Sequence, residues 1–195
     1  MLYMNQTDRS SKLVATWLLI GVGMTIIQIA LGGITRLTGS GLSITEWDVI
    51  TGFLPPLNEQ QWVTEFNKYR QTPQYHLLNF DFTLSDFKFI FFWEWFHRLW
   101  ARTIGLVFLV GFVWFLVKKY FKKEMINPLL ILFLLGALQG AIGWVMVASG
   151  LTGDAVYVKP TRLALHCIVA LGMVCYGFGF ALRFLVKRRT RDWEG

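Results

Sequence analysis

Four long apolar stretches dominate this sequence, at residues 14–34, 89–117, 128–148 and 163–186. Each is long enough to cross about 30 Å of hydrocarbon as a helix that rises about 1.5 Å per residue. We therefore expect an all-α membrane protein, a four-transmembrane-helix bundle that forms one membrane domain over residues 1–195. The second stretch is longer than a span requires, so its first two turns should project toward the interface, or the helix should tilt.

The basic residues are concentrated beside the ends of these stretches. The formal charge of +7 would suggest nucleic acid as a partner in a soluble chain, but short basic tracts next to apolar runs are typical of membrane topology. We expect no nucleic-acid binding, both termini on the cytoplasmic or matrix side, and loops 36–88 and 149–162 outside. The residues on the predicted inner side are Arg9, Lys12, Lys118, Lys119, Lys122, Lys123, Arg183, Lys187, Arg188, Arg189 and Arg191.

The loop of residues 36–88 is too long to be a simple connector, and we expect it to be partly helical. Asn58 and Gln61 are spaced as a capping box at the start of a short helix. Three aromatic residues follow at helical spacing, Trp62, Phe66 and Tyr69. We interpret this stripe as an anchor in the membrane interface, with contact to a ligand as the less favoured alternative. His76 lies among polar residues and is interpreted as a solvated histidine.

The first and third apolar stretches share a sequence pattern. Residues 28–32 read Gln-Ile-Ala-Leu-Gly and residues 139–143 read Gln-Gly-Ala-Ile-Gly, and a Ser-Gly-Leu follows each, at residues 40–42 and 149–151. The pattern suggests a duplicated helix pair, related by an axis along the membrane normal, with a site where the two units face each other. Chance similarity between glycine-rich apolar segments is the alternative.

Ionisable residues inside the predicted second and fourth helices indicate a functional site. Charge within a membrane costs about 2.5–3.5 kcal/mol per residue at the bilayer centre, so such residues usually have a role. Glu94 and His97 are three residues apart and share a helix face, and Arg162 and His166 are four apart. Arg98 and Arg102 continue the first cluster.

His97 and His166 are predicted to lie at matched depth near the outer face. The same number of residues separates His97 from Lys118 and His166 from Lys187, which places both imidazoles about 30 Å from the inner charges. Two imidazoles from facing helices are the usual axial ligands of a b-type haem iron, and arginines at that level suit the propionates. The alternative is a pair of histidines that hydrogen-bond between helices. Zinc is less favoured because no third ligand is suitably spaced.

Glu94 allows two interpretations. It neutralises Arg98, its neighbour at four residues, or it acts as an acid, base or charge stabiliser at the edge of a bound macrocycle. The residues alone leave both open.

Segments over nearly the whole chain resemble the haem A synthase family, the membrane enzymes that convert haem O to haem A for cytochrome oxidase. The resemblance is specific to the branch with a long first outer loop that lacks a cysteine pair, found in mitochondria and related bacteria. The segments that carry it are residues 32–43, 55–79, 87–98, 139–151 and 160–166.

The resemblance implies an oxidoreductase that oxidises a methyl group of haem O, through an alcohol, to the formyl group of haem A. It assigns catalysis to Glu94 and haem iron to His97 and His166. Propionates would be neutralised by Arg36, Arg98, Arg102 or Arg162, and the lipid-facing helices would accept the farnesyl tail. Haem O synthase or oxidase-assembly proteins are the partners implied, in a bacterial plasma membrane or the mitochondrial inner membrane.

Family members usually have eight helices in two similar halves, and this chain resembles the first half. We expect a four-helix member that forms a homodimer, or a split or truncated chain whose C-terminal half is missing. The absent half is the one expected to hold a resident haem b. Two other functions use the same histidine pair: a b-type cytochrome subunit for electron transfer, and a non-catalytic haem-binding protein of oxidase assembly. A transporter is less favoured, because no broken helix pair is apparent.

Overall fold

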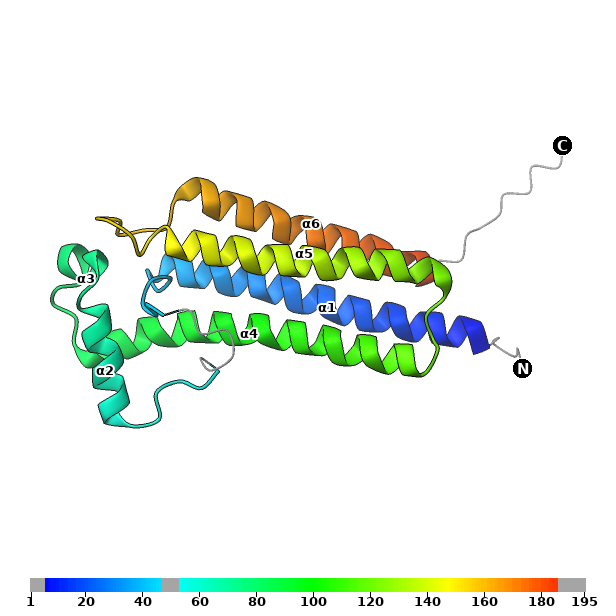
Figure 1. The fold of residues 1–195 in the computed structure, drawn as a ribbon, viewed down its shortest axis with the longest axis horizontal. Helices are drawn as coiled ribbons and strands as arrows, with labels where there is room; N and C mark the ends of the chain where they lie inside the picture. The colour runs from blue at the N-terminus through cyan, green and yellow to red at the C-terminus, as the bar shows by residue number, and fades with distance from the viewer. Residues whose placement is uncertain (1–5, 47–52, 186–195) are drawn as a thin grey trace.

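The computed structural model describes residues 6–46 and 53–185. Four long helices lie side by side, and two short ones lie across one end of them (Figure 1). We call this end the loop end, because it carries residues 38–46, 53–83 and 149–159, and we call the opposite end, with residues 118–122, the basic end. The helices are α1 Gln6–Leu37, α2 Glu59–Tyr69, α3 Pro73–Leu78, α4 Leu84–Val117, α5 Lys123–Ala148 and α6 Pro160–Leu185.

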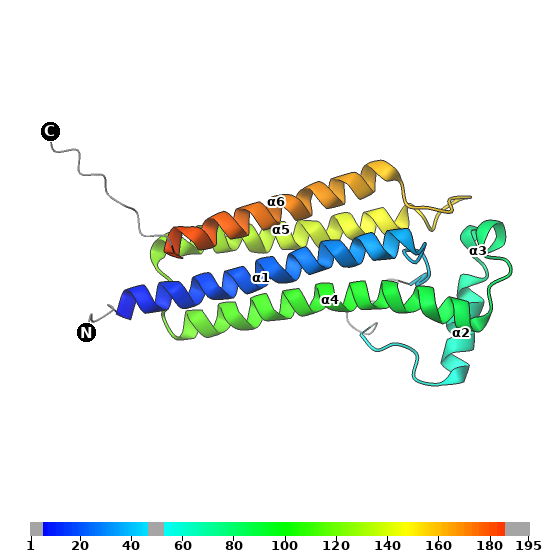
Figure 2. The same cartoon turned by 180° about the vertical axis from the view of Figure 1, so that it is seen from behind.

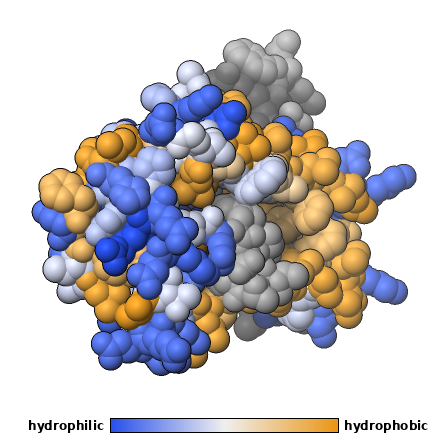
Figure 3. Space-filling view, turned by 60° about the vertical axis from the view of Figure 1, so that its left-hand side comes forward, coloured by the Kyte–Doolittle hydropathy of each residue, from blue (hydrophilic) through white to orange (hydrophobic). Residues whose placement is uncertain are grey.

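The prediction of an all-α membrane bundle is confirmed. The four long helices each have the length and apolar composition of a membrane span, with mean hydropathies of 1.9 to 2.2 over their best windows. In Figure 3 the visible flank of the bundle is mainly hydrophobic, while the loop end carries hydrophilic and hydrophobic residues together. Of the basic residues assigned to one side, Lys187, Arg188, Arg189 and Arg191 lie outside the described residues, as does Val186.

All four long helices begin earlier than the apolar stretches predicted, α1 at Gln6, α4 at Leu84, α5 at Lys123 and α6 at Pro160. α4 begins at Leu84, five residues before the predicted start, because Thr83 and Asp86 form a reciprocal capping box. α5 begins at Lys123 and carries Pro128 within its second turn. The turn between them includes Lys119 with a φ of 56°, an uncommon conformation for a residue with a side chain.

The helices pack closely at the basic end and separate toward the loop end. α1 packs against both α4 and α6, and α5 packs against α6. The buried core joins the start of α1 and α5 with the end of α4 and α6, through residues such as Val14, Phe115, Met125 and Phe180. Toward the loop end α4 and α6 diverge, as both views of the ribbon show (Figures 1 and 2). The two predicted iron ligands, His97 and His166, lie in the halves of α4 and α6 nearer the loop end.

The aromatic stripe of α2 packs on α4, so the prediction that it is a lipid-interface anchor was wrong. Tyr69 is completely buried, and Trp62 and Phe66 are partly buried beside it. Their rings meet those of Phe87 and Phe91 at centroid distances of 5.0–6.5 Å. The first two turns of α4 thus form a second small core with the loop.

The N-terminus of α2 is capped as its sequence predicts, with one difference. The Asn58 side chain accepts a hydrogen bond from the backbone N–H of Gln61 at 2.9 Å. The Gln61 side chain, however, accepts from the backbone N–H of Leu57 at 2.7 Å instead of from Asn58. The helix is therefore anchored to the residue just before its cap.

Candidate functional site

His97 of α4 lies against α1, where a glutamine contacts it. The amide nitrogen Nε2 of Gln28 is 2.8 Å from Nε2 of the imidazole and also donates to the main-chain oxygen of His97 at 3.2 Å. One turn further along α1, a Cβ on Gly32 would lie 3.4 Å from the same imidazole nitrogen. The absence of a side chain at Gly32 lets the ring approach the backbone of α1 closely.

His166 of α6 has the same surroundings on α5. The amide nitrogen of Gln139 is 3.4 Å from Nε2 of His166 and donates to its main-chain oxygen at 3.0 Å. A Cβ on Gly143 would lie only 3.0 Å from Cε1 of the ring. A glutamine, a glycine four residues later and a histidine from the following membrane helix therefore occur together twice, which supports the duplicated helix pair proposed from sequence.

Both imidazoles are partly buried. Three atoms around them are buried without a hydrogen-bond partner: Oε1 of Gln28, Oε1 of Gln139 and Nδ1 of His166. No group of three or more His, Cys, Asp or Glu side chains with metal-binding geometry occurs among the described residues. Two neutral imidazoles from different helices, with unpaired polar atoms around them, fit the donor set of a six-coordinate porphyrin iron better than that of a bare metal ion.

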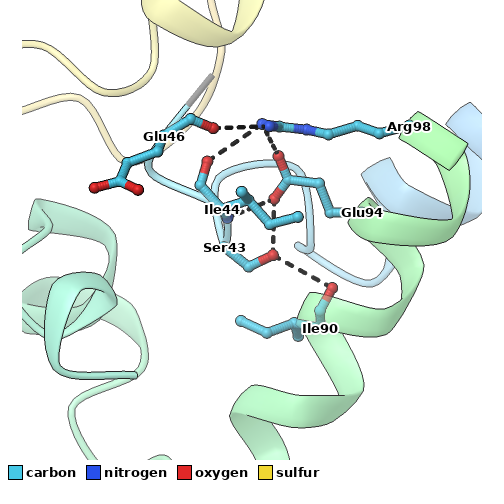
Figure 4. Close-up of polar contacts among 6 residues, drawn as sticks. All are labelled: Ser43, Ile44, Glu46, Ile90, Glu94 and Arg98. Carbon is cyan, nitrogen blue, oxygen red and sulfur yellow. Dashed lines mark hydrogen bonds and ion pairs between the residues drawn. The ribbon is translucent and has the colours of Figure 1, made fainter. Parts of the chain in front are cut away.

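Glu94 is buried, with 3% of its surface exposed, and its carboxylate holds a segment of the long loop (Figure 4). Oε2 accepts hydrogen bonds from the Ser43 hydroxyl at 2.7 Å and from the backbone N–H of Ile44 at 2.9 Å. Oε1 forms an ion pair with Arg98 at 2.6 Å. The ion pair agrees with the interpretation that Glu94 neutralises Arg98. The hydrogen bonds from Ser43 and Ile44 were not part of that interpretation.

Arg98 links the same loop segment to α4. Its guanidinium donates to the main-chain oxygens of Ile44 and Glu46, at 3.2 and 3.0 Å, while it is paired with Glu94. In Figure 4 the Glu94 carboxylate and the Arg98 guanidinium meet the loop side by side. The charged side chains of Glu94 and Arg98 therefore hold residues 43–46, the segment that follows α1, against α4.

Two of the other three predicted arginines, Arg36 and Arg162, contact the second loop and α5. Arg36, at the end of α1, is exposed and stacks its guanidinium over the Tyr157 ring of the second loop at 4.9 Å. Arg162 donates to the main-chain oxygen of Val145 near the end of α5 at 2.9 Å. Arg102 lies one turn beyond Arg98 on α4 and is partly buried. The structure therefore brings one of the four arginines, Arg98, against Glu94.

Several contacts of the site were not predicted from the sequence. The pattern shared by residues 28–32 and 139–143 includes Gln28 and Gln139, but it does not predict that each glutamine contacts a histidine. Ser43 and Ile44 lie in a loop whose path no periodicity predicts. The two Ser-Gly-Leu segments also meet: a Cβ on Gly150 would lie 2.7 Å from a methyl carbon of Leu42, so this glycine makes room for the first loop.

The sequence matches one protein-family model, COX15-CtaA, described as a cytochrome oxidase assembly protein, over residues 15–194. It is also similar to curated proteins named heme A synthase. The one from Rhodospirillum centenum is 57% identical over 155 residues, which cover 80% of this chain and 41% of that protein. The one from Flavobacterium psychrophilum is 48% identical over 185 residues, which cover 94% of this chain and 54% of that protein.

The chain thus spans about half the length of the curated relatives that it matches. A third relative, the heme A synthase of Cereibacter sphaeroides, repeats this proportion, with 51% identity over 82% of this chain and 42% of its own length. No solved structure matches the chain.

Proposed function

Because this chain belongs to the COX15-CtaA family of cytochrome oxidase assembly proteins, we propose that it takes part in the oxidation of a methyl group of haem O to the formyl group of haem A. The family and the curated relatives support an integral membrane oxidoreductase that acts on a haem. The identity of the haem as haem O, and activity of this length of chain, are parts of the proposal.

The observation that carries the proposal is the pair of similar histidine sites in the half of the bundle nearer the loop end. His97 and His166 come from different membrane helices, and each rests on a glycine of a neighbouring helix. Neutral imidazole is the usual axial ligand of haem iron, and each of these histidines is contacted by a glutamine of a neighbouring helix. We propose that these two residues bind the iron of the substrate and so fix the position of its macrocycle.

Glu94 is the proposed catalytic residue. It lies three residues from His97 on α4, so the two side chains leave the same face of the helix. Its carboxylate is oriented by Ser43, Ile44 and Arg98, which is the kind of support that keeps a charged group in one place. In that position it would accept a proton or stabilise positive charge at the reacting methyl group.

The arginines at the loop end are the proposed partners of the two propionates. Arg36 and Arg162 are the better candidates, because Arg98 already pairs with Glu94. Guanidinium groups bind carboxylates with two parallel hydrogen bonds, and an arginine that now holds a ring or one carbonyl retains donors for such a bond. Arg102 is the remaining candidate. The farnesyl tail would lie along the apolar flank of the helices.

We further propose that the protein lies in a bacterial plasma membrane, with the basic end on the cytoplasmic side. The concentration of lysines at residues 118–123 supports this orientation. The rest of the length that the relatives carry would be supplied by a second copy of the chain, by a separate four-helix partner or by a C-terminal half of the same protein.

The test is to produce the protein in cells that make haem O but lack haem A, and to identify the extracted haems by chromatography. Haem A should appear with the wild type and fall sharply with Glu94→Gln, while Glu59→Gln, which changes an exposed carboxylate of α2, should have no effect. If the protein retains bound haem b or haem O that is never oxidised, the enzyme proposal is overturned in favour of an electron-transfer or haem-binding role.

A further inference from the structure

Each histidine of the site has a glutamine amide on its Nε2 atom. Gln28 donates to His97 and Gln139 to His166, and each also donates to the main-chain oxygen of the same histidine. An amide nitrogen has hydrogen atoms to donate and no lone pair to offer. Each Nε2 atom must therefore be the acceptor in this contact, and the ring proton must be on Nδ1.

The lone pair that accepts this hydrogen bond is the one that a haem iron would require. Iron binds a neutral imidazole through the lone pair of an unprotonated ring nitrogen. An amide hydrogen and an iron atom cannot share the lone pair of one Nε2 atom. Binding of a porphyrin by Nε2 therefore requires each glutamine to withdraw from its histidine.

We propose that Gln28 and Gln139 cap the ligand nitrogens of His97 and His166 and compete with iron for them, which keeps haem binding reversible. The proposal rests on the proposed function, because it takes these two histidines as the haem ligands. It assigns the glutamines a positioning role that favours the empty site over the filled one. A site whose haem is a substrate must release its product, and such a competitor promotes release.

Two further observations support a cap that can move. The amide oxygens Oε1 of Gln28 and Gln139 are both buried without a hydrogen-bond partner, so no contact through the oxygen holds either amide in place. A buried acceptor that lacks a partner raises the free energy of the capped arrangement. In addition, the arrangement occurs twice with the same spacing to a glycine, at residues 28 and 32 and at residues 139 and 143. A single accidental contact would not be expected to repeat in both helix pairs.

The alternative role for the glutamines predicts the opposite result. If their bonds to the histidine carbonyls served to orient the ligands in the filled site, removing the amides would weaken haem binding. If they cap the ligand nitrogens, removing them leaves the lone pairs free. Haem should then bind faster and dissociate more slowly.

The experiment measures the binding of ferric protohaem to the purified protein in detergent, by the change in Soret absorbance after rapid mixing. The variants are Gln28→Leu, Gln139→Leu and the double variant, with Gln28→Met and Gln139→Met as second replacements of similar length. Gln71→Leu is the matched control, since this glutamine is exposed in the loop. The spectrum of the haem complex serves as a second measurement, because it reports whether both imidazoles still bind.

We expect each single variant to bind haem roughly fivefold more tightly than the wild type, the effect of one net hydrogen bond, and the double variant to bind more tightly still. The spectrum of the complex should be unchanged, because both iron ligands remain. Equal or weaker haem binding by both the Leu and the Met variants, with binding by the wild type intact, overturns the cap and leaves the proposed function standing. A wild-type protein that does not bind haem overturns both.

Discussion

The hydroxyl of Ser43 donates a 2.7 Å hydrogen bond to Oε2 of Glu94, a residue 51 positions later in the chain. This contact joins the segment after α1 to a helix that begins on the far side of the long loop. The backbone N–H of Ile44 donates to the same oxygen at 2.9 Å. The position of the loop over the site therefore depends on a carboxylate inside a membrane helix.

Removal of the Ser43 hydroxyl should loosen this attachment. Ser43→Ala leaves one of the two bonds to Oε2 of a buried carboxylate, and losing a hydrogen bond to a charged group costs about 1.5–3 kcal/mol. We expect a lower midpoint of thermal unfolding and faster proteolysis within the loop. Ser85→Ala, at an exposed position of α4, is the control. Proteolysis at the wild-type rate in Ser43→Ala would show that the loop is held by other contacts.

The two glycines beside the histidines should differ in their tolerance of alanine. A Cβ on Gly143 would lie 3.0 Å from the His166 ring, whereas one on Gly32 would lie 3.4 Å from the His97 ring. Overpacking of this kind costs about 1–3 kcal/mol, so Gly143→Ala should weaken haem binding roughly tenfold and Gly32→Ala clearly less. A titration with ferric protohaem measures both affinities.

Matched controls for this comparison lie on the same two helices. A Cβ on Gly33 or on Gly140 would meet nothing within 4 Å, so alanine there changes helix propensity alone. We expect both variants to bind haem as the wild type does. A larger loss for Gly32→Ala than for Gly143→Ala would contradict the packing that the structure assigns to the two rings.

The four membrane helices could be predicted from sequence because a membrane span has a minimum length and an apolar composition that no other segment of this chain shares. The matched depth of His97 and His166 stays a prediction, because the count behind it ends at Lys187, which lies outside the described residues. The starts of all four long helices were predicted late, because their first turns carry polar or charged residues that the apolar pattern leaves out. α4 extends back to Leu84 since α2 packs on Phe87 and Phe91.

The contacts of the site depend on helix rotation and loop path, which one sequence does not specify. The aromatic stripe of Trp62, Phe66 and Tyr69 has the same pattern whether it meets lipid or another helix, and the structure places it on α4. Gln28 and His97 lie 69 positions apart, so only the packing of α1 on α4 brings them together. The hydrogen bond between Ser43 and Glu94 could not be predicted either, because the path of the loop brings these two residues together.

Tyr69 should make the stability of the small core between α2 and α4 sensitive to alkaline pH. Its burial raises the pKa of the phenol from 10.0 to about 12, against a smaller opposing effect of the hydrogen bond from Asn79. Below pH 10 the phenol is neutral in both the folded and the unfolded chain, so its contribution to stability is fully present. Between pH 10 and about 12 the unfolded chain loses this proton more readily, so stability falls as pH rises.

Tyr69→Phe isolates this effect, because it removes the titrating group and keeps the ring. The free energy of unfolding of the wild type should decrease more steeply between pH 10 and about 12 than that of the variant, measured by denaturant unfolding followed by tryptophan fluorescence. Parallel pH profiles for the two proteins would mean that the phenol ionises as easily in the folded loop as in the unfolded chain.

The central claim is that His97 and His166 together bind one porphyrin iron. Electron paramagnetic resonance of the purified protein loaded with ferric protohaem tests it most directly, because two axial imidazoles give a low-spin signal. We predict this signal in the wild type and in His76→Ala, which changes an exposed histidine, and its loss in both His97→Ala and His166→Ala. An unchanged low-spin signal in either of the last two variants would contradict the claim.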